Sequence, residues 1–241
     1  MIRRTAGGSK RPHRRPRPDG PGFHNPRPSW TTELHQERLD AVAEVIAASG
    51  ARNVVDLGCG TGLLLERLAG HAQFDSLAGM DASPEAIATA RDRLRSAVQE
   101  SGERVSLFIG SFAQPHPELD GYHAAAMVET IEHVPPEQLS KIERVVFEYW
   151  APDVIVMTTP NREYNPLLGV PEGSLRHPDH RFEWSRAKFQ RWAEGVAERC
   201  GYRAEFRGIG RKDPLAGSAT QMAIFRRRPE GVVRKENREA P

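Results

Sequence analysis

Two segments of the chain carry side chains that suit a metal ion. Residues 129–133 read Glu-Thr-Ile-Glu-His, and residues 176–184 read Arg-His-Pro-Asp-His-Arg-Phe-Glu-Trp. Carboxylate oxygens and imidazole nitrogens are ligands that suit a borderline divalent ion. Together the two segments predict a metal site. A metal beside a cofactor site is typical of an enzyme.

A candidate cofactor site lies nearer the N-terminus, where a short apolar segment runs into a glycine-rich turn. Residues 53–57 predict a buried strand, and residues 58–62 read Gly-Cys-Gly-Thr-Gly. Glycines let the backbone pass close to a ligand without a Cβ clash. Asp56 can accept a hydrogen bond from a ligand ammonium group, and Asp81 follows the next strand, where an acid can bind both ribose hydroxyls. A dinucleotide-binding fold is the alternative, because a lone glycine-rich turn is weak evidence.

Strands and helices alternate along the chain. The apolar spacing predicts helices over residues 34–48, 63–68, 84–99, 136–148 and 185–200. It predicts strands over residues 53–57, 77–80, 105–109, 122–128, 154–158, 202–207 and 220–225, with a long loop over 160–183. This order predicts an α/β fold with a doubly wound, mostly parallel sheet and an antiparallel hairpin at one edge. Ligands of such sheets bind beyond the carboxyl ends of the strands, so the turn, Asp81 and Glu129 should share one rim.

The two ends differ in composition from the rest of the 241-residue chain. Residues 1–30 hold eight Arg and Lys against one acid, although the whole chain has a formal net charge of only +2. We expect residues 1–30 to be a disordered basic arm, 31–225 one folded domain and 226–241 a disordered charged tail. A basic arm contacts nucleic acid or is simply solvated. Two cysteines and no long apolar run predict a cytoplasmic protein without a membrane segment.

The segment from Val55 to Gly62 resembles the first motif of class I S-adenosylmethionine-dependent methyltransferases. The acid at Asp81 strengthens the resemblance, which implies S-adenosylmethionine as the cofactor. A serine follows Gly110 where the family often has an acid, so Ser111 is a mild departure from the pattern. The implied cofactor-binding residues are Asp56, Gly58, Cys59, Gly60, Asp81 and Ser111.

Three motifs in order resemble the Hua-enhancer-type small-RNA methyltransferases, over about residues 30–225. They are the 129–133 segment, residues 159–165 and residues 176–184. The resemblance implies methylation of the ribose 2′-hydroxyl of the 3′-terminal nucleotide of RNA, with Mn²⁺ or Mg²⁺. Metals lower the pKa of a bound hydroxyl and orient it. The implied metal ligands are Glu129, Glu132, His133 and His180, and the catalytic residues are these four together with His177 as a candidate base.

Neighbouring side chains have more than one interpretation. Asp179 and Glu183 either support the histidine ligand from behind or form surface salt bridges. Phe182 and Trp184 are expected in the core, with stacking on the terminal base as the alternative. Arg162 and Arg176 are expected to contact phosphate or to be solvated.

Two other functions remain open from the residues alone. One is a small-molecule O-methyltransferase acting on a catechol-like or polyprenyl-phenol substrate, which does not require His180. The other is a non-catalytic RNA-binding module, which does not require an intact set of metal ligands. For the leading hypothesis the expected partner is an RNA 3′ end. Bacterial members of the family act with an RNA-repair kinase, phosphatase and ligase, so the resemblance also implies such a partner. We expect a monomer that does not associate with membranes.

Overall fold

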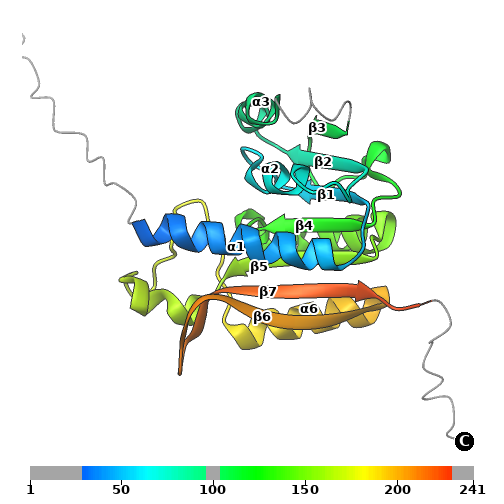
Figure 1. Cartoon of the computed structure of the whole chain (residues 1–241). Helices are drawn as coiled ribbons and strands as arrows, with labels where there is room; N and C mark the ends of the chain where they lie inside the picture. Colours follow the sequence, from blue (N-terminus) through cyan, green and yellow to red (C-terminus); the bar gives the residue numbers. More distant parts are fainter. Residues whose placement is uncertain (1–28, 96–103, 230–241) are drawn as a thin grey trace, which may run out of the picture.

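The computed structural model of the chain describes residues 29–95 and 104–229 (Figure 1). Helices and strands begin at Ser29 and end at Arg227, slightly beyond the predicted domain of residues 31–225. The predicted basic arm and charged tail lie almost entirely outside the described residues. In the part of the chain that the structure describes, no helix is long and apolar enough to cross a membrane.

Seven strands form one sheet in the order β3-β2-β1-β4-β5-β7-β6. They are β1 (Asn53–Leu57), β2 (Ser76–Asp81), β3 (Val105–Ile109), β4 (Ala124–Val128), β5 (Val154–Pro160), β6 (Tyr202–Asp213) and β7 (Gly217–Arg227). The first five strands are parallel, and β7 runs antiparallel between β5 and β6. The mostly parallel sheet with an antiparallel edge hairpin is therefore confirmed. The strand order reverses between β1 and β4, which is where ligands bind in open sheets of this kind.

Helices cover both faces of the sheet (Figure 1). The α-helices are α1 (Ser29–Ala48), α2 (Leu63–Ala69), α3 (Pro84–Arg93), α5 (Leu139–Glu143) and α6 (Arg186–Cys200). Val54 and Ala124 pack in the core cluster that includes α1, α2 and α3 side chains, whereas Val55 and Ala125 pack in the cluster that includes α5 and α6 side chains. Successive strand residues thus face opposite layers, as expected for strands buried on both sides.

Three predicted segments differ in detail from the structure. The predicted helix of residues 136–148 consists of a 3₁₀ turn, η3 (Pro136–Gln138), then α5, then η4 (Arg144–Trp150) with π-helical hydrogen bonding. The predicted loop of residues 160–183 contains a 3₁₀ segment, η5 (Arg162–Leu168). The predicted helix of residues 84–99 is α3, which is capped by Ser83 and ends at Arg93, and residues 96–99 lie outside the described part.

Candidate active site

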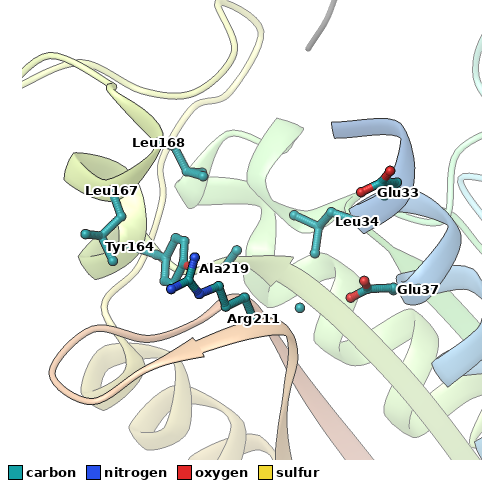
Figure 2. Close-up of a pocket in the computed structure, with 9 residues that line it drawn as sticks. Glu33, Leu34, Glu37, Tyr164, Leu167, Leu168, Arg211 and Ala219 are labelled. Carbon is teal, nitrogen blue, oxygen red and sulfur yellow. The ribbon is translucent and has the colours of Figure 1, made fainter. Parts of the chain in front are cut away.

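Two adjoining pockets open at the carboxyl ends of β1, β2 and β4, with volumes of about 420 and 430 Å³. Gly58, Glu129 and His133 line both of them. The first pocket also contains Asp56 and the side chains of α1 and of the 177–180 loop, and the second contains Asp81, Ser111 and Phe112. A third pocket, of about 410 Å³, lies between α1, η5 and the β6–β7 hairpin (Figure 2).

The glycine-rich turn after β1 has a backbone that favours glycine. Gly58 and Gly60 have φ angles of 83° and 52°, in the left-handed region where a Cβ is costly. A Cβ on Gly58 would also overlap the side chain of Thr130. Cys59 contributes mainly its backbone, because its side chain is buried against Gly79 and burial raises the pKa of its thiol.

Asp56 is a buried carboxylate at the base of the first pocket. Its Oδ1 has no hydrogen-bond partner among the described residues. Burial, followed by the charge of Asp81, raises the pKa of Asp56 to about 7. A buried acceptor without a donor is costly unless a ligand supplies one. The position therefore fits the ammonium group of the predicted cofactor.

Asp81 holds the shape of the turn as well as lining the second pocket. Its two carboxylate oxygens accept hydrogen bonds from the backbone N–H groups of Gly60 and Ser83, both at 2.8 Å. Each oxygen retains a further lone pair for a ribose hydroxyl. Ser111 lines the same pocket, and its Oγ accepts a hydrogen bond from the N–H of Ala113 at 3.2 Å. The structure thus gathers the predicted cofactor residues around two adjoining pockets.

Glu132, His133 and His180 form a cluster whose ligand atoms all lie within 4.8 Å of one another. Glu132 is fully buried in η2 (Ile131–His133), and its Oε2 accepts a hydrogen bond from the Thr159 hydroxyl at 3.0 Å. Its Oε1 has no partner in the described chain. Burial, followed by the charge of Glu129, raises the pKa of Glu132. An unpartnered carboxylate oxygen beside two imidazoles fits a divalent cation.

Glu183 fixes the orientation of His180 from behind. The Nδ1 of His180 lies 2.6 Å from Oε1 of Glu183, whose side chain is fully buried. Burial alone would raise the pKa of Glu183, but hydrogen bonds from His180, Asn165 and the N–H of Arg176 lower it overall. An ionised carboxylate only accepts, so Nδ1 carries the proton and Nε2 keeps its lone pair for a metal. Asp179, the other predicted support, lies 3.6 Å from Nδ1 of His177 instead.

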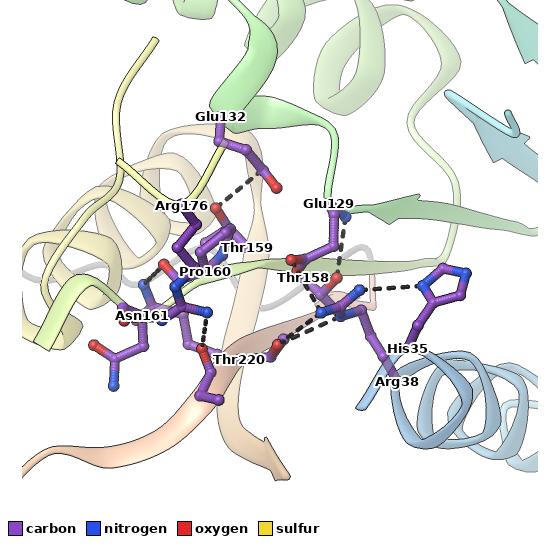
Figure 3. Close-up of polar contacts among 12 residues, drawn as sticks. His35, Arg38, Glu129, Glu132, Thr158, Thr159, Pro160, Asn161, Arg176 and Thr220 are labelled. Atoms are coloured by element: carbon purple, nitrogen blue, oxygen red, sulfur yellow. Dashed lines mark hydrogen bonds and ion pairs between the residues drawn. The ribbon is translucent and has the colours of Figure 1, made fainter. Parts of the chain in front are cut away.

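Glu129 points away from this cluster, toward helix α1 (Figure 3). Its backbone is left-handed, with φ of 52°, and its N–H donates to the carbonyl oxygen and the hydroxyl of Thr158. Its Oε2 lies 3.3 Å from Nη2 of Arg38, and its Oε1 is buried without a partner among the described residues. The structure therefore gathers three of the four predicted ligands and places the fourth in an ion pair at the wall of both pockets.

Arg38 lines the first pocket but belongs to none of the sequence motifs. Its guanidinium donates to the Thr220 hydroxyl on β7 from Nη2 at 3.2 Å, and Nη1 lies 3.2 Å from Nδ1 of His35 (Figure 3). The signal was present in the sequence. Arg38 lies four residues after Leu34 and four before Val42, inside the apolar stripe of a helix, where a charge needs a specific partner.

The structure places Arg176 and Trp184 among other protein groups. The phosphate-contact interpretation of Arg176 is wrong, because its guanidinium donates to Asn165 and to the carbonyl groups of Asn161 and Ala219. Trp184 is buried, which confirms the core interpretation.

The ring of His177 lies 5.6 Å from that of His180, with its side chain 45% exposed. Arg162 is exposed, so its predicted phosphate contact stays a prediction.

The sheet order, the glycine-rich turn after β1 and the acid at the end of β2 together define a class I methyltransferase fold. The family described as "Methyltransferase domain" matches residues 54–153. The structure is similar to that of the methyltransferase domain of bacterial CtHen1, with a TM-score of 0.73 and 38% identity, covering 80% of this chain and 99% of that one. It is also similar to the small RNA methyltransferase HEN1, with a TM-score of 0.76 and 32% identity, covering 80% of this chain and 26% of that one. The chain belongs to the Hen1 family of small-RNA methyltransferases.

Curated relatives of the chain share one description. The small RNA 2′-O-methyltransferase of Gallus gallus is 35% identical over 223 residues, which are 88% of this chain and 58% of that protein. The small RNA 2′-O-methyltransferase of Mus musculus is 36% identical over 203 residues, which are 80% of this chain and 50% of that protein. The chain thus spans about half the length of these relatives.

Proposed function

We propose that the chain transfers a methyl group from S-adenosylmethionine to the 2′-hydroxyl of the 3′-terminal ribose of RNA, with the help of Mn²⁺ or Mg²⁺. One observation carries the proposal. The cluster of Glu132, His133 and His180 adjoins the pockets of the glycine-rich turn, and His133 belongs to both features. Cofactor and acceptor would therefore meet at His133.

Glu132, His133 and His180 would hold the metal, and Glu129 stands at the wall beside them. A bound divalent ion lowers the pKa of a hydroxyl and orients it for reaction. Two neighbouring hydroxyls can occupy adjacent positions on such an ion, and only the 3′ end of RNA offers free 2′- and 3′-hydroxyls together. The ligand set thus favours a terminal ribose as the acceptor.

The chain's own residues supply binding, orientation and a proton acceptor. Asp56 would bind the cofactor ammonium through its unpartnered oxygen, and Asp81 would bind the ribose hydroxyls. The methyl group passes from the sulfonium to the 2′-oxygen, and the hydroxyl proton leaves to a base. His177 is the proposed base, because it lines the first pocket beside His180 and is half-exposed to solvent.

The walls of the first pocket favour a ribose over a polyprenyl phenol. His35, Arg38 and His177 line it together with His133 and His180 of the metal cluster, beside the apolar side chains of Leu39, Leu63, Leu64 and Val128. A polyprenyl tail needs an apolar channel, whereas these side chains offer hydrogen bonds to hydroxyl and phosphate oxygens.

Methyl transfer from labelled S-adenosylmethionine to a short single-stranded RNA tests the proposal. We expect label on an RNA that ends in a ribonucleotide, in the presence of Mn²⁺ and not of a chelator. The control is the same RNA ending in a 2′-deoxynucleotide, which should take no label. Label on the control, or transfer that survives the chelator, would contradict the proposal.

Binding of Mn²⁺ tests the metal ligands without turnover. We expect His180→Ala to lose Mn²⁺ affinity in calorimetry while its affinity for S-adenosylhomocysteine stays unchanged. Equal Mn²⁺ affinity in the variant and the wild type would remove His180 from the metal site. An RNA-repair partner and a monomeric state stay predictions, to be tested by co-purification and light scattering.

A further inference from the structure

The third pocket is built by three parts of the chain and is separate from the proposed active site (Figure 2). Tyr164 and Leu167 line it from η5, Glu33 and Glu37 from α1, and Arg211 from β6. The carboxylates of the two glutamates point across the pocket toward Tyr164 and Arg211 in Figure 2. Its volume of about 410 Å³ lies in the range of pockets that bind small molecules.

The backbone of β6 is irregular where it forms this pocket. The pairing of β6 with β7 shifts register between Ile209 and Lys212, which is a β-bulge or a similar irregularity. Such irregularities re-aim side chains at the edges of sheets. Gly210 has φ of 87°, and a Cβ there would lie 2.6 Å from the Leu34 side chain. The hairpin thus approaches α1 closely at Gly210 and presents the next residue, Arg211, to the pocket.

The third pocket shares two elements with the proposed active site. On α1, Glu37 lines the third pocket and the next residue, Arg38, lines the first. On β7, Ala219 lines the third pocket and the next residue, Thr220, accepts the hydrogen bond of Arg38. The two pockets therefore lie on either side of one buried contact. An RNA with its 3′ end in the active site would extend its preceding nucleotides along these shared elements toward the third pocket.

The lining chemistry fits a nucleobase better than a phosphate. Tyrosine rings and arginine guanidinium planes stack on unpaired bases of single-stranded RNA. Carboxylates accept hydrogen bonds from the exocyclic amino groups of bases, as they do for cytosine N4. Glu33 and Glu37 would repel a phosphate, and both are exposed at the pocket.

We propose that the third pocket binds the base of a nucleotide just before the 3′-terminal one, and that it favours bases with an amino group over uracil. The inference rests on the proposed methyl transfer to RNA 3′ ends and adds a sequence preference to it. Stacking would come mainly from the exposed Arg211 over the edge of the buried Tyr164 ring, and the preference for amino groups from Glu33 and Glu37.

The test uses one short RNA in which each of the two nucleotides before the last is in turn A, C, G, U or abasic. RNA affinity is measured by fluorescence anisotropy with S-adenosylhomocysteine bound, and methyl transfer is measured separately. At one of the two positions, wild-type protein should bind the intact RNA roughly 5- to 150-fold more tightly than the abasic RNA, which is the range for stacking of one base. At that position cytosine should bind more tightly than uracil.

Surface variants connect the preference to the pocket. Arg211→Ala should reduce the difference between intact and abasic RNA, and Glu37→Gln should reduce the preference for cytosine over uracil. The matched control is Lys212→Ala, an exposed neighbour that does not line the pocket, and it should retain both differences. Circular dichroism checks that each variant is folded.

Two failures are distinguishable. Absence of methyl transfer to every RNA would overturn the proposed function, while the anisotropy arm would still test the pocket. Wild-type affinity that does not change with the base, or equal discrimination by Arg211→Ala and Lys212→Ala, would overturn the nucleobase site. The latter result would assign the pocket to another ligand, such as a protein segment.

Discussion

Replacing Glu183 by glutamine tests how the loop that carries His180 is held. The carboxylate accepts from His180 at 2.6 Å, from the N–H of Arg176 at 2.7 Å and from Nδ2 of Asn165 at 2.6 Å. The Oδ1 of Asn165 is itself occupied by Nε of Arg176, at 2.6 Å. The network is closed, so every donor already has its acceptor.

Glutamine cannot satisfy this network in either orientation of its amide. With its oxygen toward His180 and the Arg176 N–H, its NH₂ group faces the NH₂ group of Asn165. Turning the Asn165 amide would only place that NH₂ group against Nε of Arg176. With the glutamine amide reversed, its NH₂ group faces the Arg176 N–H. One buried donor is always left without an acceptor, which costs about 1–3 kcal/mol of stability.

The same change should weaken metal binding. His180 would lose the negative charge that fixes its tautomer and raises its basicity, and such outer partners are worth ~10–100-fold in metal affinity. We expect Glu183→Gln to lower Mn²⁺ affinity by this factor in calorimetry and to lower the free energy of unfolding in denaturant. The matched control is Asp179→Asn, an exposed acid of the same loop that contacts His177.

The outcome separates two ideas. If the wild type and Glu183→Gln bind Mn²⁺ equally well, Glu183 does not orient His180 for metal binding. A wild-type protein that does not bind Mn²⁺ would refute the metal site itself. A loss in Asp179→Asn as large as in Glu183→Gln would show a general effect of charge.

Three further predictions concern the cofactor turn and the α1 contact. Because the pKa of Asp56 is about 7 and only its ionised form attracts an ammonium, affinity for S-adenosylhomocysteine should fall as pH drops below about 7. Asp56→Asn should bind S-adenosylhomocysteine weakly at every pH. A wild-type affinity that stays constant from about pH 5.5 to about pH 8.5 would contradict this prediction. Gly58→Ala should lower the melting temperature more than Gly60→Ala, because a Cβ on Gly58 overlaps a neighbour and one on Gly60 meets nothing within 4 Å; equal melting temperatures would speak against it. Arg38→Met should lower the free energy of unfolding by about 1–3 kcal/mol in chemical denaturation. Adding Glu129→Gln to this variant should recover part of the loss. Strictly additive effects of the two changes would exclude coupling between the two side chains.

The parallel half of the sheet follows closely from the sequence. The strands at residues 53–57 and 105–109 have the predicted bounds, although β1 is buried and β3 is a partly exposed edge strand. Short apolar runs between turn residues predict both kinds of strand. The hairpin is longer than predicted. Gly208, Gly210 and Arg211 lie between the two predicted strands, but β6 continues through them. Gly208 pairs with Gln221, and the register shifts between Ile209 and Lys212.

The site was predictable where its residues follow strand ends. Glu132, His133 and His180 meet because parallel strands deliver their following loops to one rim. The partner of Arg38, which is Glu129, and the protein contacts of the half-buried Arg176 were not predictable from spacing. Each depends on contacts between segments that the topology brings together, and helical or strand periodicity carries no information about such pairs.

The place of β7 in the sheet has a consequence for synthesis of the protein. It is the last strand of the described chain, yet it lies between β5 and β6 and supplies the partners of Arg38 and Arg176 through Thr220 and Ala219. On the ribosome, the cofactor half can pair its parallel strands while the hairpin is still being translated. The contacts of Arg38 with Thr220 and of Arg176 with Ala219 can form only after β7 has emerged, so this wall of the site is the last part to be completed.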